Sequence, residues 1–139
     1  MKKLKNIIDQ LIDKIKIMQN PTVIGLDPRY EMLPKCVKEK YPETLEGVGQ
    51  AIIEYNKALI DEICDVIPAI KPQIAFYEMY GIPGIQAFKE TCEYAKQKGM
   101  FVIADIKRGD IGSTAQGYSN AYLGKTKIGE NEQSLYDID

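Results

Sequence analysis

The chain has 139 residues, of which 45% are apolar and 27% charged, and its net charge at neutral pH is -2. This length and composition fit a single globular domain that can bury a core. The small net charge favours neither a nucleic acid nor a membrane surface as a partner. Histidine is absent, which excludes histidine-based triads, imidazole relays and most zinc sites.

The cysteines and the N-terminus both favour a cytoplasmic protein. The three cysteines lie far apart without a C-x-x-C pair, which is typical of reduced thiols; they are Cys36, Cys64 and Cys92. A signal peptide needs an uninterrupted apolar core. Charged side chains interrupt the apolar residues here, at Asp9, Asp13, Lys14 and Lys16.

The first 20 residues instead predict an amphipathic helix. Apolar side chains recur at spacings of three and four, at Leu4, Ile7, Ile8, Leu11, Ile12 and Ile15, as on one face of a helix. We expect this helix to pack on the domain; a helix on a membrane surface is the alternative. No stretch approaches the roughly 20 apolar residues of a membrane span.

The rest of the chain alternates short apolar runs with helical patterns. Strands are expected at residues 22–26, 69–75 and 101–106, and helices at 43–67, 81–99 and 114–123. Residues 124–139 are polar and weakly patterned, which indicates a loop or a disordered tail. The order of these elements predicts a parallel sheet with helical crossovers.

Charged residues at the strand ends favour a TIM (β/α)8 barrel over an open sheet. Asp27, Lys71 and Asp105 each lie at or near the carboxyl end of a predicted strand. In a barrel those ends share one mouth, so the charges would converge. A complete barrel needs about 250 residues. We therefore expect the chain to supply the N-terminal helix and about the first three β/α units of a longer barrel.

The stretch "FVIADIKRGDIGST" at residues 101–114 carries the most chemistry. Asp105 and Lys107 project to the same side of the strand. Asp110 follows in a loop, and Lys71 comes from the neighbouring strand. A lysine flanked by carboxylates stays protonated, so it can stabilise an anion developing on a substrate and then protonate it.

This charge pattern is suited to decarboxylation without a cofactor. An aspartate at about 4 Å from a substrate carboxylate repels it by roughly 1 kcal/mol in water and about 4 kcal/mol near a protein surface. Loss of CO₂ relieves that repulsion. The alternative interpretation is an ion-pair network that only caps a barrel mouth, because coupled charges mark functional sites only statistically.

The sequence resembles the orotidine 5'-monophosphate decarboxylase family. The pattern Asp105-x-Lys107-x-x-Asp110-Ile111-x-x-Thr114 is similar to the active-site signature of that family, and "VIGLDPRY" and "IKPQIAFYE" resemble its first two barrel strands. The stretches "KPQIAFYE" and "GKTKIGENEQSLYDID" resemble its longer, bacterial type. The resemblance implies a TIM barrel that converts orotidine 5'-monophosphate to UMP in pyrimidine biosynthesis, with no cofactor and no metal.

The resemblance also implies a role for each matching residue. Lys107 would protonate carbon 6 of the pyrimidine, and Asp105 would crowd the substrate carboxylate. Lys71 would bridge the carboxylates and a ribose hydroxyl, and Asp27 would accept from a ribose hydroxyl. The remaining matches would reach the active site of the other subunit of a homodimer; they are Asp110, Ile111 and Thr114.

Two other interpretations remain open. A Mg²⁺-dependent sugar-phosphate decarboxylase or lyase of the same superfamily shares the D-x-K-x-x-D pattern, although Lys71-Pro72-Gln73 occupies the region where those enzymes place an acidic residue. The second interpretation is a half-barrel that has no catalytic activity. In the family, the loops that bind the substrate phosphate follow later strands. Binding of such a non-reacting part of the substrate helps to lower the barrier of the reaction. We therefore expect the 139-residue chain alone to be inactive or nearly so.

Overall fold

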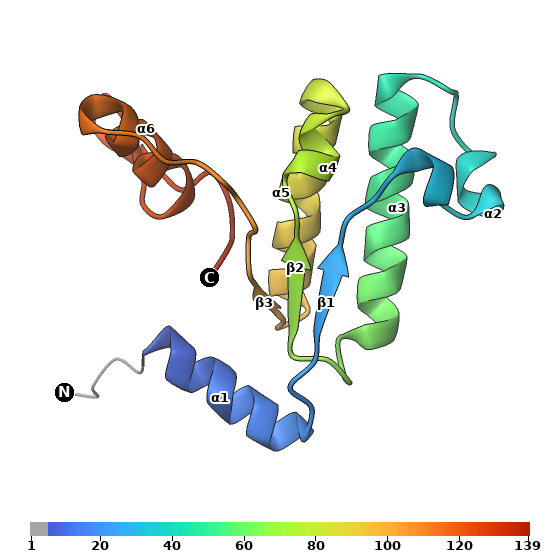
Figure 1. The fold of residues 1–139 in the computed structure, drawn as a ribbon, viewed down its shortest axis with the longest axis horizontal. Helices are drawn as coiled ribbons and strands as arrows, with labels where there is room; N and C mark the ends of the chain where they lie inside the picture. Colours follow the sequence, from blue (N-terminus) through green and yellow to red (C-terminus); the bar gives the residue numbers. More distant parts are fainter. Residues whose placement is uncertain (1–5) are drawn as a thin grey trace.

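The computed structural model describes residues 6–139 and contains a three-stranded parallel sheet (Figure 1). The sheet consists of β1 (Val23–Leu26), β2 (Ala69–Pro72) and β3 (Phe101–Val102), in that order. The helices are α1 (Ile7–Met18), α2 (Lys35–Lys38), α3 (Leu45–Ile63), α4 (Ala75–Glu78), α5 (Gly81–Gln97) and α6 (Gly112–Tyr122), with a 3-10 turn η1 (Tyr30–Met32). The parallel sheet and the helices between its strands confirm the expected order of consecutive β/α units.

The register of the sheet separates a covered face from an open one. Gly25 lies opposite Lys71, and Leu26 lies opposite Pro72. Side chains alternate along a strand, so Leu26, Ile70 and Val102 share the face toward α3 and α5, where they are almost fully buried. Lys71 lies on the opposite face, which is open to solvent.

The core lies between the sheet and the helices α3 and α5, which pack against each other. Thr44 caps α3 by accepting a hydrogen bond from the Gly47 amide at 3.1 Å, which pairs an otherwise free donor at the helix start. Ile52 and Ile60 of α3 and Phe88 of α5 have no exposed surface. These buried contacts fix the sheet against the helices and so fix the positions of the strand ends.

Helix α1 lies across the end of the sheet opposite to the strand carboxyl ends (Figure 1). Asn6 caps its start, and the expected helical spacing is confirmed from Ile7 onward. Its contact with the domain is slighter than we expected, because none of its residues is buried and Ile17 is 82% exposed. Lys14 donates to the Gly99 carbonyl. Leu4 lies outside the described residues, and no described helix has the length and apolarity to cross a membrane.

The ladder of β3 is shorter than the predicted strand at 101–106. The amides of Ile103 and Asp105 still donate to Ile70 and Pro72 of β2, at 2.9 and 3.0 Å. Pro72 has no amide hydrogen to donate in return, which interrupts the ladder beside it. Pairing resumes as an isolated bridge between Gln73 and Asp105, so the segment still runs beside β2 as far as Asp105.

The C-terminal region contains structure where we expected a loop or a disordered tail. Strands β4 (Thr126–Ile128) and β5 (Asn131–Gln133) form an antiparallel hairpin. Tyr136 stacks on Tyr122 of α6, with ring centroids 5.1 Å apart. The Asp139 amide donates to the Val102 carbonyl at 3.0 Å, so the end of the chain lies beside the edge of β3.

Candidate active site

Four of the expected site residues lie at the carboxyl ends of the strands, on the side of the sheet that the helices leave open. Gly25 of β1 and Lys71 of β2 are register partners, and Gln73, directly after β2, is bridged to Asp105. Asp27 follows β1 directly, Lys71 lies on the open face of β2, and Asp105 continues beside β2 through its bridge to Gln73. Lys107 lies in the segment after this bridge and contacts Asp105. Contacts join three of these residues, Lys71, Asp105 and Lys107.

Asp105 lies between the two lysines. Its Oδ2 accepts from Lys71 Nζ at 3.1 Å, and its Oδ1 is 3.4 Å from Lys107 Nζ. The hydrogen bond from Lys71 and, to a lesser degree, that from Lys107 hold the pKa of Asp105 below its ordinary value of 3.8. The carboxylate is therefore ionised at neutral pH, and each oxygen faces one cation.

The two lysines differ in exposure. The side chain of Lys71 is 38% exposed and that of Lys107 is 81% exposed. Lys71 is thus held along the sheet, while Lys107 contacts Asp105 from the solvent side. This leaves the Lys107 ammonium accessible to a molecule bound over the open face.

The carboxylate of Asp27 folds back over Gly25. Its Oδ2 lies 3.8 Å from the position that a Cβ on Gly25 would occupy. Because Gly25 is the register partner of Lys71, the Asp27 carboxylate lies at the same end of the sheet as Lys71. The open face thus offers carboxylates and ammonium groups side by side, a set that can bind hydroxyls and anions.

Asp110, Ile111 and Thr114 lie apart from this group. They stand at the start of α6 and are exposed, Ile111 by 85%. The Asp110 Oδ1 accepts from the Ile111 amide at 2.8 Å. Among residues 6–139, no hydrogen bond or ion pair joins Asp110 to Lys71, Asp105 or Lys107.

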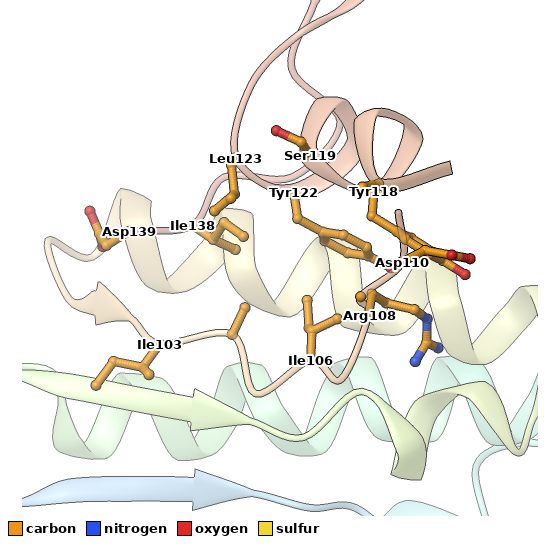
Figure 2. Close-up of a pocket in the computed structure, with 13 residues that line it drawn as sticks. Ile103, Ile106, Arg108, Asp110, Tyr118, Ser119, Tyr122, Leu123, Ile138 and Asp139 are labelled. Carbon is orange, nitrogen blue, oxygen red and sulfur yellow. The ribbon is translucent and has the colours of Figure 1, made fainter. Parts of the chain in front are cut away.

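A cavity of about 340 Å³ separates the segment after β3 from α6 (Figure 2). Ile103, Ile106 and Arg108 lie on one side of it, and Tyr118 and Tyr122 project from α6 on the other, with Asp110 beside Tyr118. Its lining contains neither Lys71 nor Asp105 nor Lys107. The cavity is therefore distinct from the cluster of charges on the open face.

An ion pair that no sequence pattern indicated lies beside the site. Arg108 donates to Glu78 at the end of α4, and this interaction raises the pKa of the Arg108 guanidinium further. The pair joins the segment after β3 to the connection after β2. Glu78 stands in the quoted stretch "IKPQIAFYE" and Arg108 follows Lys107 directly, so their positions were visible, but their pairing depends on how two loops fold.

Comparison with known proteins decides the family. Residues 21–128 match the family described as "Orotidine 5'-phosphate decarboxylase / HUMPS family". The chain belongs to this family. The match includes both lysines and both aspartates of the open face, and it confirms the resemblance seen in the sequence.

Relatives in the family cover the chain almost completely. The orotidine 5'-phosphate decarboxylase of Petrotoga mobilis is 41% identical over 117 residues, 84% of this chain and 39% of the relative. That of Caldicellulosiruptor saccharolyticus is 35% identical over 138 residues, 96% of this chain and 45% of the relative. The chain thus spans less than half the length of these curated relatives and matches their N-terminal portion.

Solved structures agree with the fold. The structure of Leishmania donovani OMP decarboxylase superimposes with a TM-score of 0.60 at 29% identity, over 84% of this chain and 39% of that chain. The structure of Leishmania donovani UMP synthase gives a TM-score of 0.62 at 28% identity, over 85% of this chain and 22% of that chain. The three-stranded sheet of this family member is therefore part of a TIM barrel.

Proposed function

We propose that this chain supplies the charged centre of an enzyme that decarboxylates orotidine 5'-monophosphate to UMP without a cofactor, in the cytoplasm. The observation that carries the proposal is Asp105 held between Lys71 and Lys107, at 3.1 and 3.4 Å, in a chain of the decarboxylase family. We take the substrate from the names of the relatives, which are orotidine 5'-phosphate decarboxylases.

In the proposed reaction, Asp105 faces the carboxylate of the substrate. Two negative charges at about 4 Å repel by about 4 kcal/mol near a protein surface, and departure of CO₂ removes this repulsion. The carbon–carbon bond breaks and its electron pair stays on carbon 6 of the ring. Lys107 Nζ then transfers a proton to that carbon and regains one from solvent. The exposed ammonium of Lys107 suits both transfers.

The remaining residues bind substrate in this proposal. Lys71 keeps Asp105 ionised and reaches a ribose hydroxyl, and Asp27 accepts a hydrogen bond from the ribose. Asp110, Ile111 and Thr114 serve the active site of a second subunit, which makes a homodimer the working form. Their exposure and their separation from the lysines support this assignment.

A Mg²⁺-dependent sugar-phosphate decarboxylase or lyase is the second candidate, because the matching family description also includes HUMPS. A chelator separates the two proposals. Turnover of orotidine 5'-monophosphate should be unchanged in excess EDTA. No turnover of orotidine 5'-monophosphate, together with turnover of a sugar phosphate that EDTA abolishes and Mg²⁺ restores, would favour the second candidate.

The decisive experiment substitutes Lys107 in a complete barrel. The chain covers 45% of the Caldicellulosiruptor saccharolyticus relative. Residues 1–139 are joined to the remaining C-terminal part of that relative, and we call the product the chimeric barrel. Lys107→Ala should lower kcat by about 10³-fold, within the range for loss of a general acid. The melting temperature should stay within about 2 °C, because surface side chains contribute little to stability.

Lys35→Ala is the matched control. The Lys35 side chain is 85% exposed and lies 3.5 Å from Glu39, nearly the exposure and distance of Lys107 beside Asp105. The control should leave both kcat and melting temperature unchanged. A Lys107→Ala barrel with full turnover, or one that only loses stability, would support the non-catalytic half-barrel instead.

A further inference from the structure

The loop that carries Asp27 is held at both ends by tyrosine hydroxyls from another part of the chain. Tyr77 of α4 donates its hydroxyl hydrogen to the Leu26 carbonyl at 3.2 Å. Tyr80 accepts a hydrogen bond from the Tyr30 amide at 2.7 Å. Asp27 lies between these two anchored residues. The connection after β2 therefore fixes the backbone on either side of a proposed substrate-binding carboxylate.

The Tyr77 hydroxyl is itself fixed by the core. Tyr77 has no exposed surface, and its oxygen accepts from Asn56 Nδ2 of α3 at 3.0 Å. The same amide group donates to Thr91 Oγ1 of α5 at 3.0 Å. Burial raises the pKa of Tyr77, so the phenol stays protonated and its hydrogen remains available to Leu26. Two helices thus determine where this hydroxyl points.

The loop between the anchors has little freedom of its own. Pro28 is buried, and its ring restricts the backbone. The Arg29 guanidinium lies over the Phe76 ring, 5.6 Å from its centroid. Asp27 is exposed, and its carboxylate lies over Gly25. The aromatic residues 76, 77 and 80 therefore restrain residues on both sides of Asp27 and leave its carboxylate accessible.

We infer that Tyr77 and Tyr80 are positioning residues for the ribose contact of Asp27. This inference rests on the proposed function. Neither hydroxyl touches the substrate; both act by fixing the loop that carries Asp27. A carboxylate already held in place loses less conformational freedom when it binds a hydroxyl. Loosening the loop should weaken substrate binding and leave the chemistry at Lys107 intact.

The test uses Tyr77→Phe and Tyr80→Phe in the chimeric barrel, because each change removes one hydroxyl and keeps the ring. KM for orotidine 5'-monophosphate should rise about threefold to tenfold, the equivalent of one hydrogen bond, with kcat changed less than twofold. Inhibition by UMP should weaken by the same factor, whereas inhibition by 2',3'-dideoxyuridine 5'-monophosphate should not change. In an Asp27→Ala background, neither tyrosine change should raise KM further.

Tyr94→Phe is the matched control, since the Tyr94 hydroxyl bonds Asp61 at 2.8 Å on the exposed side of the domain. It should leave KM and both inhibition constants unchanged. Hydrogen exchange adds a direct readout: the Tyr30 amide should exchange at least about tenfold faster in Tyr80→Phe, because it loses its acceptor.

The two levels of the proposal fail in different ways. If the unsubstituted chimeric barrel does not decarboxylate the substrate, the proposed function fails, and the positioning role fails with it. If the unsubstituted barrel is active and both tyrosine variants keep its KM, only the positioning role is overturned. A fall in kcat and melting temperature at constant KM, or equal effects on UMP and the dideoxy analogue, would also overturn it.

Discussion

Lys71 Nζ lies 3.1 Å from Asp105 Oδ2, a contact between a side chain of β2 and one of the segment that follows β3. Gln73 is bridged to Asp105, so Lys71 reaches along the sheet to the carboxylate. The pairing is a consequence of strand register, which the buried residues on the opposite face fix. The charge state of the candidate site is therefore set by the packing of the core.

The two lysines should affect the pKa of Asp105 unequally. Lys71 is the larger cause of the lowered pKa and is less exposed than Lys107. Lys71→Met should therefore raise the pKa of Asp105 toward 3.8 by more than Lys107→Met does. Carbon-13 NMR titration of the Asp105 carboxyl measures both shifts.

The sign of the accompanying stability change follows from linkage. Because the folded pKa of Asp105 lies below its unfolded value, the contribution of Asp105 to stability is present above pH 4 or so and is lost as the pH falls through the folded pKa. Lys71→Met should therefore make the free energy of unfolding fall less as the pH is lowered. Equal shifts in the two variants, or a larger one in Lys107→Met, would contradict the assignment of Lys71 as the main partner.

The 139-residue chain alone should form no detectable UMP. Without the rest of a barrel, the open face of the sheet has no opposing wall, and binding energy from distant groups of the substrate is missing at the reacting centre. The measurement is the absorbance change of orotidine 5'-monophosphate at high protein concentration. Steady UMP formation by the purified chain, absent in Lys107→Ala, would refute this expectation.

The sequence predicted the grouping of charges on the open face because it depends on simple periodicities. Alternation along a strand places Asp105 and Lys107 together, and parallel strands bring Lys71 and Asp27 to the same end. Asp27 and Lys71 lie at the ends of β1 and β2, and Asp105 and Lys107 lie in or just after the strand that the sequence predicts at 101–106. Their approximate placement therefore needed no knowledge of loop conformation.

Other features depend on tertiary contacts that no local pattern specifies. The interruption of β3 follows from the missing amide of Pro72 on the neighbouring strand. The Arg108–Glu78 pair joins two separate loops. The hydroxyl of Tyr77 reaches the Leu26 carbonyl across 51 positions of sequence. Tyr77 reads as an ordinary apolar core residue until the strands, α3 and α5 are assembled around it.

Thiol reactivity should distinguish Cys36 from Cys92. Cys36 is exposed and Cys92 is buried, and burial raises the pKa of the Cys92 thiol to about 12. Only the thiolate reacts, so a maleimide at pH 8 should label Cys36 within minutes and leave Cys92 unmodified. Peptide mass mapping in the Cys64→Ser background measures both sites. Rapid labelling of Cys92 without denaturant would show that α5 does not pack as described.

Gly84 should be intolerant of a side chain, whereas Gly117 should accept one. A Cβ on Gly84 would lie 1.9 Å from the Tyr77 carbonyl oxygen, while a Cβ on Gly117 would meet nothing within 4 Å. Gly84→Ala should therefore lower the free energy of unfolding by about 3 kcal/mol, as overpacking does. Gly117→Ala, inside α6, should raise it by up to about 1 kcal/mol through helix propensity.

Urea unfolding of the two variants measures this contrast in the chimeric barrel. Both are glycine-to-alanine changes within helices, so they differ mainly in the surroundings of the added methyl group. A Gly84→Ala protein as stable as the parent would mean that α5 stands further from Tyr77. Since Tyr77 anchors the loop of Asp27, a partly folded Gly84→Ala barrel should also bind UMP more weakly. Gly117→Ala should leave that affinity unchanged.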